Sequence, residues 1–423
     1  MHHLLENLIL YSNNNDSVIS KVGELCKGAK NIESNSNGLA HEIIRDILKM
    51  SSEYGFNGNL WQSCVAHYIA FNENAFSLSL ENQKEPINDV FGAKDCETLD
   101  KIFNFDFKDI EAALRIDYFS SLSKYEGKFE ATDAGKEIEE LKEALQSSED
   151  FFKTISKFYK SHGVGTLGLS KAFTIKVDGE KAGFVPVKSL ENIKLSDLIG
   201  YEVQKNKLID NTEAFLKRKP ANNVLLFGDG GTGKSTSIRA IANQYHNDGL
   251  RIIQVYRHQM KYLSQIIASI KTRNYRFIIY MDDLSFEDFE TEYKYLKAVI
   301  EGGLEPRPEN VLIYATSNRR HLIKETWKDR DDIEHVGDIH RSDSIEEKVS
   351  LAARFGVQIY YGKPTNEEFH QIVETLAKRE GVKLSTEELH AEANKWQIRH
   401  GGVSGRSARQ LIDYIKGTEE DTK

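Results

Sequence analysis

Apolar side chains along the first 160 residues recur at the spacing of amphipathic helices. Between Gly38 and Met50, the apolar residues on one helical face are Ile43, Ile44, Ile47 and Leu48. Residues 136–160 carry a second stripe, made of Ile138, Leu141, Leu145, Phe152, Ile155 and Phe158. A coiled coil needs a heptad register sustained over three or four repeats, which this stretch lacks. We therefore expect one or two helices packed on a core.

A different pattern begins near Leu195, where short apolar runs alternate with helical segments. The runs are residues 222–227, 251–256, 276–281, 310–315 and 357–361. The stretches 236–245 and 260–270 between them have helical spacing. Because strands that alternate with helices are typical of a parallel sheet, the sequence predicts an α/β fold with a five-stranded parallel sheet. Three further helices are expected after Pro364.

These changes of pattern divide the chain. Residues 161–190 contain glycines and short β-type runs, as expected of a hairpin that connects two domains. The predicted parts are a mainly α-helical N-terminal domain at 1–160, the β-rich connection at 161–190, the α/β domain at 191–363, a helical lid at 364–417 and a tail at 418–423.

Charge is distributed unevenly over the 423 residues. Residues 1–150 contain 27 acidic and 14 basic side chains, a net charge of −13, whereas the remainder contains 38 acidic and 42 basic side chains, a net charge of +4. Two regions with such different charge are expected to have different roles. Hydrophobic residues make up 39% of the chain, enough for substantial cores, and the six prolines exclude collagen-like and proline-rich disordered classes.

The sequence favours a cytoplasmic protein without membrane association. No apolar run approaches the roughly 18 residues that span a bilayer. The first 17 residues have no Lys or Arg before their short apolar stretch and no small-residue cleavage site, unlike a secretory signal. Cys26, Cys64 and Cys96 are spaced 38 and 32 residues apart, which fits neither a paired metal motif nor a disulfide framework. We expect these cysteines to be core residues in a reducing compartment.

The most informative motif is a glycine-rich loop between a predicted strand and a predicted helix. Its sequence is Gly228-Asp229-Gly230-Gly231-Thr232-Gly233-Lys234-Ser235-Thr236, which matches the P-loop pattern. Glycines allow backbone N–H groups to curve around an anion, and the helix N-terminus adds a partial positive charge. Lys234 would contact the β- and γ-phosphates, and the Ser235 hydroxyl would bind Mg²⁺. The loop therefore predicts a nucleotide site.

Polar side chains follow two further strands. Asp282 and Asp283 come directly after the third strand, where a carboxylate would lie beside the loop and Mg²⁺ needs oxygen ligands. We expect Asp282 to hold Mg²⁺ through water, and Asp283 to orient and polarise the attacking water. Asn318 ends the fourth strand, which we place between the first and third strands of the sheet. Its amide would hydrogen-bond the γ-phosphate or the water.

Taken together, these motifs resemble the AAA-type (AAA+) ATPases over residues 191–417. GDGGTGKS resembles Walker A, FIIYMDD resembles Walker B, YATSN the sensor-1 strand, LAARFG the arginine-finger segment and GVSGRSARQLI the sensor-2 helix. More closely, NTEAFL, MDDLSFE and EGGLEPRPENVLIYATSNRRHLI are similar to a bacterial family of AAA-type ATPases known mainly as a domain of unknown function. The resemblance implies ATP and Mg²⁺ as ligands, ATP hydrolysis and a homo-oligomer.

The resemblance also implies roles for residues outside the loop. LSDLIGYEVQKNKL is similar to the segment that lines the adenine pocket, and the residues that it places near the base are Ile199, Gly200 and Tyr201. Arg354 would be the finger that enters a neighbouring subunit's site and neutralises transition-state charge. Arg406, with Arg409 as the second candidate, would reach the γ-phosphate from the lid.

The function that we predict is an ATP-hydrolysing oligomer that remodels or regulates a macromolecular client, a protein rather than a nucleic acid, recognised by the N-terminal region. One alternative is a slow ATP-dependent switch or scaffold, because Asp282-Asp283 stands where most of the superfamily carries Asp-Glu. Another is an initiator-like, nucleic-acid-associated ATPase, based on Asp-Asp, on RFG and on Arg319 and Arg320. A small GTPase is a poorer fit, since the nearest match to the guanine-specifying Asn-Lys-x-Asp pattern, at Asn206, has the wrong spacing and precedes the loop.

Overall fold

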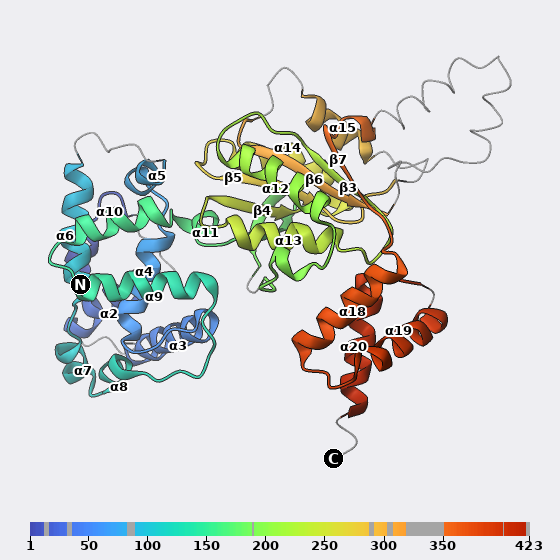
Figure 1. The fold of residues 1–423 in the computed structure, drawn as a ribbon. Helices are drawn as coiled ribbons and strands as arrows, with labels where there is room; N and C mark the ends of the chain where they lie inside the picture. Colours follow the sequence, from blue (N-terminus) through green and yellow to red (C-terminus); the bar gives the residue numbers. More distant parts are fainter. Residues whose placement is uncertain are drawn as a thin grey trace. The chain divides into compact units, whose positions relative to one another are not determined.

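The computed structural model describes residues 1–11, 17–31, 36–82, 89–187, 190–286, 292–302, 308–318, 351–400 and 402–419. The chain divides into two compact units, Met1–Ser170 and Lys171–Lys423 (Figure 1). The candidates Arg319 and Arg320 lie outside the described residues. Within the described ranges, no helix is both long enough and apolar enough to cross a membrane.

The first unit is helical throughout its described residues, as predicted. Its elements are α1 (His2–Glu6), α2 (Val18–Asn31), α3 (Ser36–Tyr54), α4 (Leu60–Phe71), α5 (Ala75–Glu81), α6 (Val90–Phe103), α7 (Lys108–Leu114), α8 (Tyr118–Ser121), the 3-10 turn η1 (Leu122–Lys124), α9 (Asp133–Gln146), α10 (Phe151–Ser161) and α11 (Gly165–Gly168). Side-chain oxygens cap several helix N-termini: Asn59 accepts from the Gln62 N–H at α4, and Thr132 accepts from the Gly135 N–H at α9.

The apolar stripes lie largely where the periodicity places them. On α3, Ile43 and Ile47 are buried. The stripe of residues 136–160 belongs to two helices, α9 and α10, and packs into the unit's core rather than forming a coiled coil. One position differs, since Phe151 is buried and Phe152 only partly so. The break between the helices, where Asp150 caps α10, resets the helical phase.

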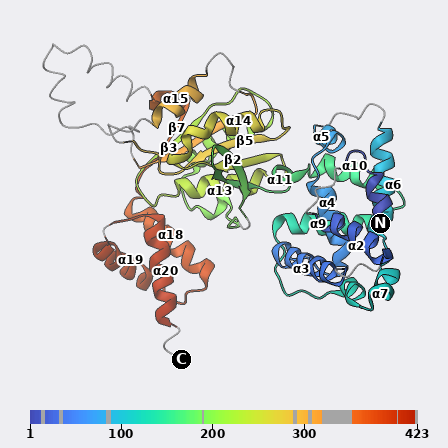
Figure 2. The same ribbon diagram turned by 180° about the vertical axis from the view of Figure 1, so that it is seen from behind.

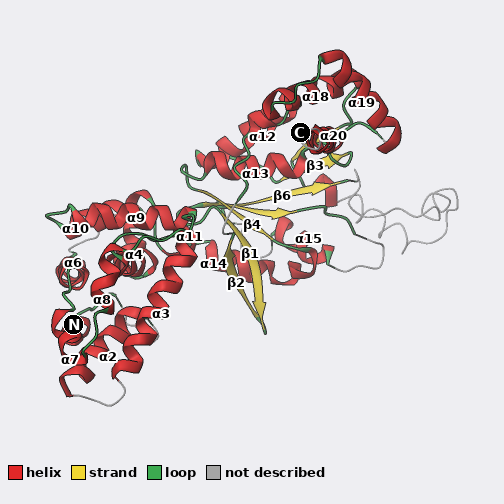
Figure 3. Ribbon diagram, turned by 90° about the horizontal axis from the view of Figure 1, so that it is seen from below, coloured by secondary structure: helices red, strands yellow, loops and turns green. Residues whose placement is uncertain are grey.

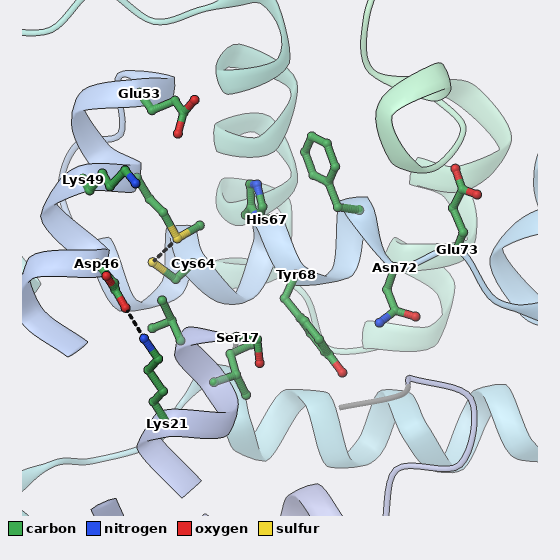
Figure 4. Close-up of a pocket in the computed structure, with 14 residues that line it drawn as sticks. Ser17, Lys21, Asp46, Lys49, Glu53, Cys64, His67, Tyr68, Asn72 and Glu73 are labelled. Carbon is green, nitrogen blue, oxygen red and sulfur yellow. Dashed lines mark hydrogen bonds and ion pairs between the residues drawn. The ribbon is translucent and has the colours of Figure 1, made fainter. Parts of the chain in front are cut away.

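The cysteines and one cavity belong to the same unit. Cys26, Cys64 and Cys96 are buried and free, as predicted for core residues. A cavity of about 680 Å³ opens between α2, α3 and α4 (Figure 4). On its wall the Lys21 ammonium contacts Asp46 at 2.6 Å.

His67 on α4 lines this cavity and is held by aromatic rings. Its imidazole stacks on Phe71 with a centroid separation of 4.4 Å and meets Tyr54 edge-on at 4.8 Å. The Nε2 atom is buried and has no hydrogen-bond partner among the described residues. Burial lowers the pKa of His67 to about 4, against a slight raising effect of Glu53. The imidazole is therefore neutral in the folded protein near pH 7.

Replacing His67 with phenylalanine should make the first unit less sensitive to acid. An unfolded histidine titrates near pH 6.5, so between pH 6.5 and 4 the unfolded state binds more protons and stability falls as the pH falls. Between pH 7 and 5 this loss is about 2 kcal/mol in the wild type and should be absent in His67→Phe. Calorimetric unfolding of both proteins at the two pH values measures the difference. Equal slopes for the two proteins would contradict it.

The second unit contains a seven-stranded sheet. Its elements are β1 (Ala172–Asp178), β2 (Lys181–Pro186), η2 (Leu195–Asp197), α12 (Glu202–Leu216), β3 (Val224–Gly228), α13 (Lys234–Tyr245), β4 (Leu250–Gln254), η3 (Arg257–Tyr262), α14 (Leu263–Ile270), β5 (Arg276–Met281), α15 (Tyr293–Glu301), β6 (Val311–Ser317) and β7 (Val357–Tyr361). The strand order is β2-β1-β4-β5-β6-β3-β7. All neighbouring pairs are parallel except β1 with β2.

All five predicted strands are present, and the fourth of them, β6, lies between β5 and β3 as expected. Helices cover both faces of the sheet: α12 and α13 pack on one face, and α14 and α15 lie on the other (Figures 1 and 3). Because all neighbouring pairs among these five strands are parallel, the five strands point the same way and their carboxyl ends form one edge.

The hairpin expected within the connecting residues 161–190 is also part of the sheet. β1 pairs in parallel with β4 through Ala172–Thr174 and Ile252–Gln254, and β2 continues the sheet. Without the hairpin, β4 would be an edge strand with unpaired N–H and C=O groups. The two added strands move the sheet's edge to β2.

After the sheet come three helices with their own apolar core, as the sequence predicts. They are α18 (Asn366–Glu380), α19 (Thr386–His400) and α20 (Gly405–Glu419), drawn in red in Figure 2. Phe369, Val373, Ala393 and Ile412 are among the side chains buried between them. Thr365 and Glu368 form a capping box at the start of α18, and Gly381 ends it in a left-handed conformation.

Candidate functional site

The glycine-rich loop joins β3 to α13 at the carboxyl edge of the sheet. Gly228 has a φ of +131°, and a Cβ there would overlap the carbonyl oxygen of Tyr361 on β7, so only glycine fits. Gly233 at the N-cap of α13 has no side chain to cap the helix, which leaves the first N–H groups of α13 for a ligand. Thr232, 2% exposed, braces the loop by donating to the Asp229 carbonyl at 2.8 Å. The arrangement is suited to an anion.

The rest of the loop lies in the same tight connection. A Cβ at Gly230 would meet open space, Ser235 and Thr236 are half-buried on the first turn of α13, and Asp229 Oδ2 accepts from the Lys363 N–H at 3.1 Å. This last hydrogen bond links the loop to the segment that precedes the lid.

Lys234 points its ammonium group back into the loop. It donates to the carbonyl oxygens of Gly228 and Asp229 at 2.9 and 2.6 Å and to Asn318 Oδ1 at 3.0 Å. Burial lowers the pKa of Lys234, an effect that the negative charges of Asp229, Asp283 and Asp282 partly offset. The structure thus joins the predicted phosphate-binding lysine, at the start of α13, to the predicted sensor amide, directly after β6.

Asp282 lies beside Ser235, as a shared metal site requires. The Ser235 hydroxyl donates to Asp282 Oδ1 at 2.7 Å, and the Thr316 hydroxyl donates to the same oxygen at 2.6 Å. Burial alone would raise the pKa of Asp282, and the hydrogen bonds from Thr316 and Ser235 outweigh it, so this pKa lies below its ordinary value. The carboxylate is therefore ionised near neutral pH.

These oxygens fit Mg²⁺ better than a transition metal. The described residues contain no group of three or more His, Cys, Asp or Glu side chains that would form a full protein cage. Mg²⁺ needs no such cage, since it retains several waters and uses one or two protein oxygens together with substrate phosphates. Ser235 Oγ and Asp282 Oδ1, which lie within hydrogen-bonding distance of each other, are such a pair.

Asp283 points to a different partner from Asp282. Its backbone has a φ of +49°, which ends β5 abruptly, and its carboxylate accepts from Asn318 Nδ2 at 2.8 Å. Because Asn318 also accepts from Lys234, three of the four predicted catalytic side chains form one hydrogen-bonded chain. Thr316, which is not among the predicted site residues, contacts both acids, and its only signal in the sequence is its place two residues before Asn318.

The segment expected to face adenine lies between the loop and the lid. The Leu198 side chain lies against Gly233 of the loop, so close that a Cβ added at Gly233 would meet it. Ile199 packs against the core of the lid. Gly200 and Tyr201 both have positive φ values, +77° and +60°. The Tyr201 hydroxyl donates to the Gly362 carbonyl at 2.9 Å, and its ring stacks on Tyr361 at 5.2 Å. Burial raises the pKa of Tyr201 to about 12.

The lid meets the loop through the start of α20. The Arg406 N–H donates to the Gly231 carbonyl at 3.2 Å, and a Cβ at Gly231 would lie 2.9 Å from Ser404 Oγ. Arg409, the second candidate, instead donates to Glu380 Oε1 at 2.6 Å on the lid itself. Of the two candidates, Arg406 is the lid arginine that contacts the glycine-rich loop.

Arg354 precedes β7 and makes an ion pair within its own chain, with Glu301 of α15. Its side chain is 30% exposed, while its Nε is buried and has no hydrogen-bond partner among the described residues. The described contacts of Arg354 do not include the loop, so it is brought together with Glu301 rather than with the other predicted site residues.

Comparison with known proteins identifies a family. Residues 169–419 match the profile described as "Protein of unknown function (DUF815)". The replication factor C large subunit of Methanococcus vannielii is 32% identical over 78 residues, 18% of this chain and 16% of that protein.

Solved structures of RuvB from Thermotoga maritima are also similar. The structure of the RuvB Holliday junction branch migration motor is 18% identical to this chain, with a TM-score of 0.37. The match covers 54% of this chain and 65% of the RuvB chain. A point mutant of the same RuvB is 18% identical, covers 54% and 67%, and has a TM-score of 0.39. The chain thus spans about a sixth of the curated relative and about two thirds of the RuvB chains.

Proposed function

Since the chain belongs to the DUF815 family of proteins of unknown function, we propose that it is an AAA-type ATPase. It would bind ATP with Mg²⁺ at the β3–α13 loop, hydrolyse the ATP as a homo-oligomer and act on a protein client. The observation that carries the proposal is the hydrogen-bonded chain Lys234–Asn318–Asp283 beside the pair Ser235–Asp282, next to an uncapped helix N-terminus.

Each of these residues has a defined task in the proposed reaction. The N–H groups of α13 and the Lys234 ammonium bind the phosphates, so Lys234 exchanges carbonyl oxygens of its own loop for phosphate oxygens. Bound Mg²⁺ would neutralise charge between the β- and γ-phosphates, held by Ser235 and Asp282. Asp283 orients the attacking water. Asn318, which donates to the Asp283 carboxylate, keeps that carboxylate directed at the γ-phosphate.

Assembly follows from Arg354. Within one chain Arg354 forms an ion pair with Glu301, and its described contacts do not include the glycine-rich loop of the same chain. We assign it to a neighbouring subunit's γ-phosphate, which would replace Glu301 as its anion. Client recognition is assigned to the first unit, whose residues 1–150 carry a net charge of −13.

A slow ATP-dependent switch is the second candidate, and one observation favours it. The Asp283 carboxylate is one methylene shorter than the usual glutamate and already accepts a hydrogen bond from Asn318. Phosphate release measured with and without ATP-driven assembly separates the candidates. The nucleic-acid alternative rests on Asp282-Asp283, on the RFG at residues 354–356 and on Arg319 and Arg320, and the last two lie outside the described residues.

The Asp283→Asn protein should bind ATP with unchanged affinity and lose hydrolysis by about 100-fold or more, the typical contribution of a positioned acid–base group. Asparagine retains the size and the hydrogen bond to Asn318 but cannot polarise water. Phosphate release and equilibrium binding of labelled ATP measure the two effects. Asp413→Asn, on the exposed face of α20, is the matched control. An unchanged rate in Asp283→Asn would exclude the assigned role.

The same variant is suited to identifying the client. An oligomer that retains ATP should also retain its client, so an affinity pull-down with Asp283→Asn and ATP should enrich a protein that the Lys234→Ala variant does not. Equal recovery with both variants would contradict an ATP-dependent client.

A further inference from the structure

Thr316, the penultimate residue of β6, contacts both acidic residues of the site. Its side chain is 1% exposed. The Oγ1 atom donates to Asp282 Oδ1 at 2.6 Å and accepts from the Asp283 N–H at 3.0 Å. An amide N–H can only donate and an ionised carboxylate can only accept, so the direction of both hydrogen bonds is fixed. One hydroxyl therefore serves both acids at once.

The Thr316 backbone contacts the same turn. Its carbonyl oxygen accepts from the Leu284 N–H at 2.7 Å. Asp283 lies between these two anchored N–H groups, with a φ of +49° that non-glycine residues adopt only at a cost in free energy. Thr316 thus fixes the backbone turn that directs Asp283 toward Asn318. Its hydroxyl proton also fixes the Asp282 oxygen that accepts from Ser235.

The register of the sheet explains why this residue has the role. Met281 at the end of β5 is paired with Ala315, so the residues that follow each, Asp282 and Thr316, lie side by side where the strands end. Leu226 on β3 is paired with Thr316 on its other side. The hydroxyl is therefore at the junction between the strand that carries the acids and the strand that carries the loop.

We propose that Thr316 is a positioning residue of the ATP site: its hydroxyl sets the Asp282 carboxylate for Mg²⁺ and holds the turn that directs Asp283. This inference rests on the proposed function. Thr316 itself does not touch the phosphates or the water. Its loss should therefore weaken the response to Mg²⁺ and the catalytic rate while sparing metal-free binding to Lys234 and the helix N-terminus.

The test compares Thr316→Val, which retains the shape without the hydroxyl, with Thr316→Ser, which retains the hydroxyl. In Thr316→Val the Mg²⁺ concentration at half-maximal binding of a fluorescent ATP analogue should rise at least tenfold, with kcat lowered at least tenfold. Binding of the analogue in EDTA should change less than twofold. Thr316→Ser should keep both quantities within about threefold of the wild type.

Thr212→Val is the matched control for losing a buried hydroxyl. Thr212 is fully buried on α12, donates to the Leu208 carbonyl at 2.8 Å and lies 2.9 Å from the Tyr314 hydroxyl, away from both acids. The Thr212→Val substitution should lower the thermal midpoint of unfolding and leave the Mg²⁺ dependence of analogue binding unchanged. Should Thr316→Val fail to fold, Thr316→Ala, which also lacks the hydroxyl, takes its place beside Thr316→Ser.

Two results would overturn the inference: a Mg²⁺ response in Thr316→Val equal to that of Thr212→Val, or equal impairment in Thr316→Ser and Thr316→Val. Failure of the proposed function has a different signature. If the wild type released no phosphate, the hydrolytic role would be lost, and the Mg²⁺ dependence of analogue binding would still decide the role of Thr316. If Lys234→Ala bound the analogue as well as the wild type, the nucleotide site itself would be wrong.

Discussion

Lys234→Ala should abolish detectable ATP binding. The ammonium group already makes three hydrogen bonds at the loop, and phosphate oxygens would replace the two carbonyl acceptors. Hydrogen bonds to charged groups contribute about 1.5–3 kcal/mol each, so two of them correspond to a loss of affinity of roughly 100-fold or more. Equilibrium binding of labelled ATP, with and without Mg²⁺, measures the change.

The control for Lys234→Ala is Lys219→Ala, which removes an exposed lysine of the same unit. That variant should bind ATP as the wild type does. The alanine at position 234 also removes a contact to Asn318, so folding is checked by the thermal midpoint without nucleotide. A folded Lys234→Ala protein with wild-type affinity would show that the glycine-rich loop is not the phosphate site.

Arg354→Ala should lower turnover by about 1,000-fold or more, in the range of arginine fingers supplied to phosphoryl-transfer sites, with ATP affinity changed less than threefold. Within one chain the described contacts of Arg354 are with Glu301 and not with the loop, so we expect the loss of turnover to arise in a neighbouring site. Phosphate release at saturating ATP and binding at equilibrium separate the two quantities.

A mixing experiment tests that Arg354 acts between subunits. A Lys234→Ala subunit retains Arg354 but has no working loop, and an Arg354→Ala subunit has the reverse defect. Their mixture should recover a measurable fraction of wild-type turnover, because some interfaces pair an intact loop with an intact finger. Arg45→Ala in the first unit is the control for loss of an exposed arginine. Normal turnover in a strictly monomeric Arg354→Ala protein would exclude the role.

Local signals in the sequence were sufficient for much of the fold. Each of the five parallel strands is a short apolar run in the sequence. The loop at residues 228–236 is made of contiguous residues, so its conformation and chemistry depend on one local segment. Asp282 and Asn318 were placed correctly because the ends of parallel strands share an edge, so knowledge of strand order was enough to bring them to Ser235 and Lys234.

Pairings between distant segments were not readable in this way. Nothing local to Arg354 indicates that Glu301 is its partner, and the double contact of Thr316 depends on the register between β5 and β6. The sheet's extra hairpin was recognised as a hairpin, while its pairing with β4 depends on residues some 80 positions later. The choice between Arg406 and Arg409 likewise required the position of Glu380.

The strand order has a kinetic consequence for the newly made chain. β3, which carries the glycine-rich loop, lies between β6 and β7, and its partner Val357 on β7 is about 130 residues further along. At a synthesis rate of about 5–20 residues per second, β7 leaves the ribosome roughly 7–25 s after β3. For that time one side of β3 has no neighbour, so the loop is completed late. Contacts this distant in sequence also slow folding itself, so the unpaired edge of the nascent sheet stays exposed for longer.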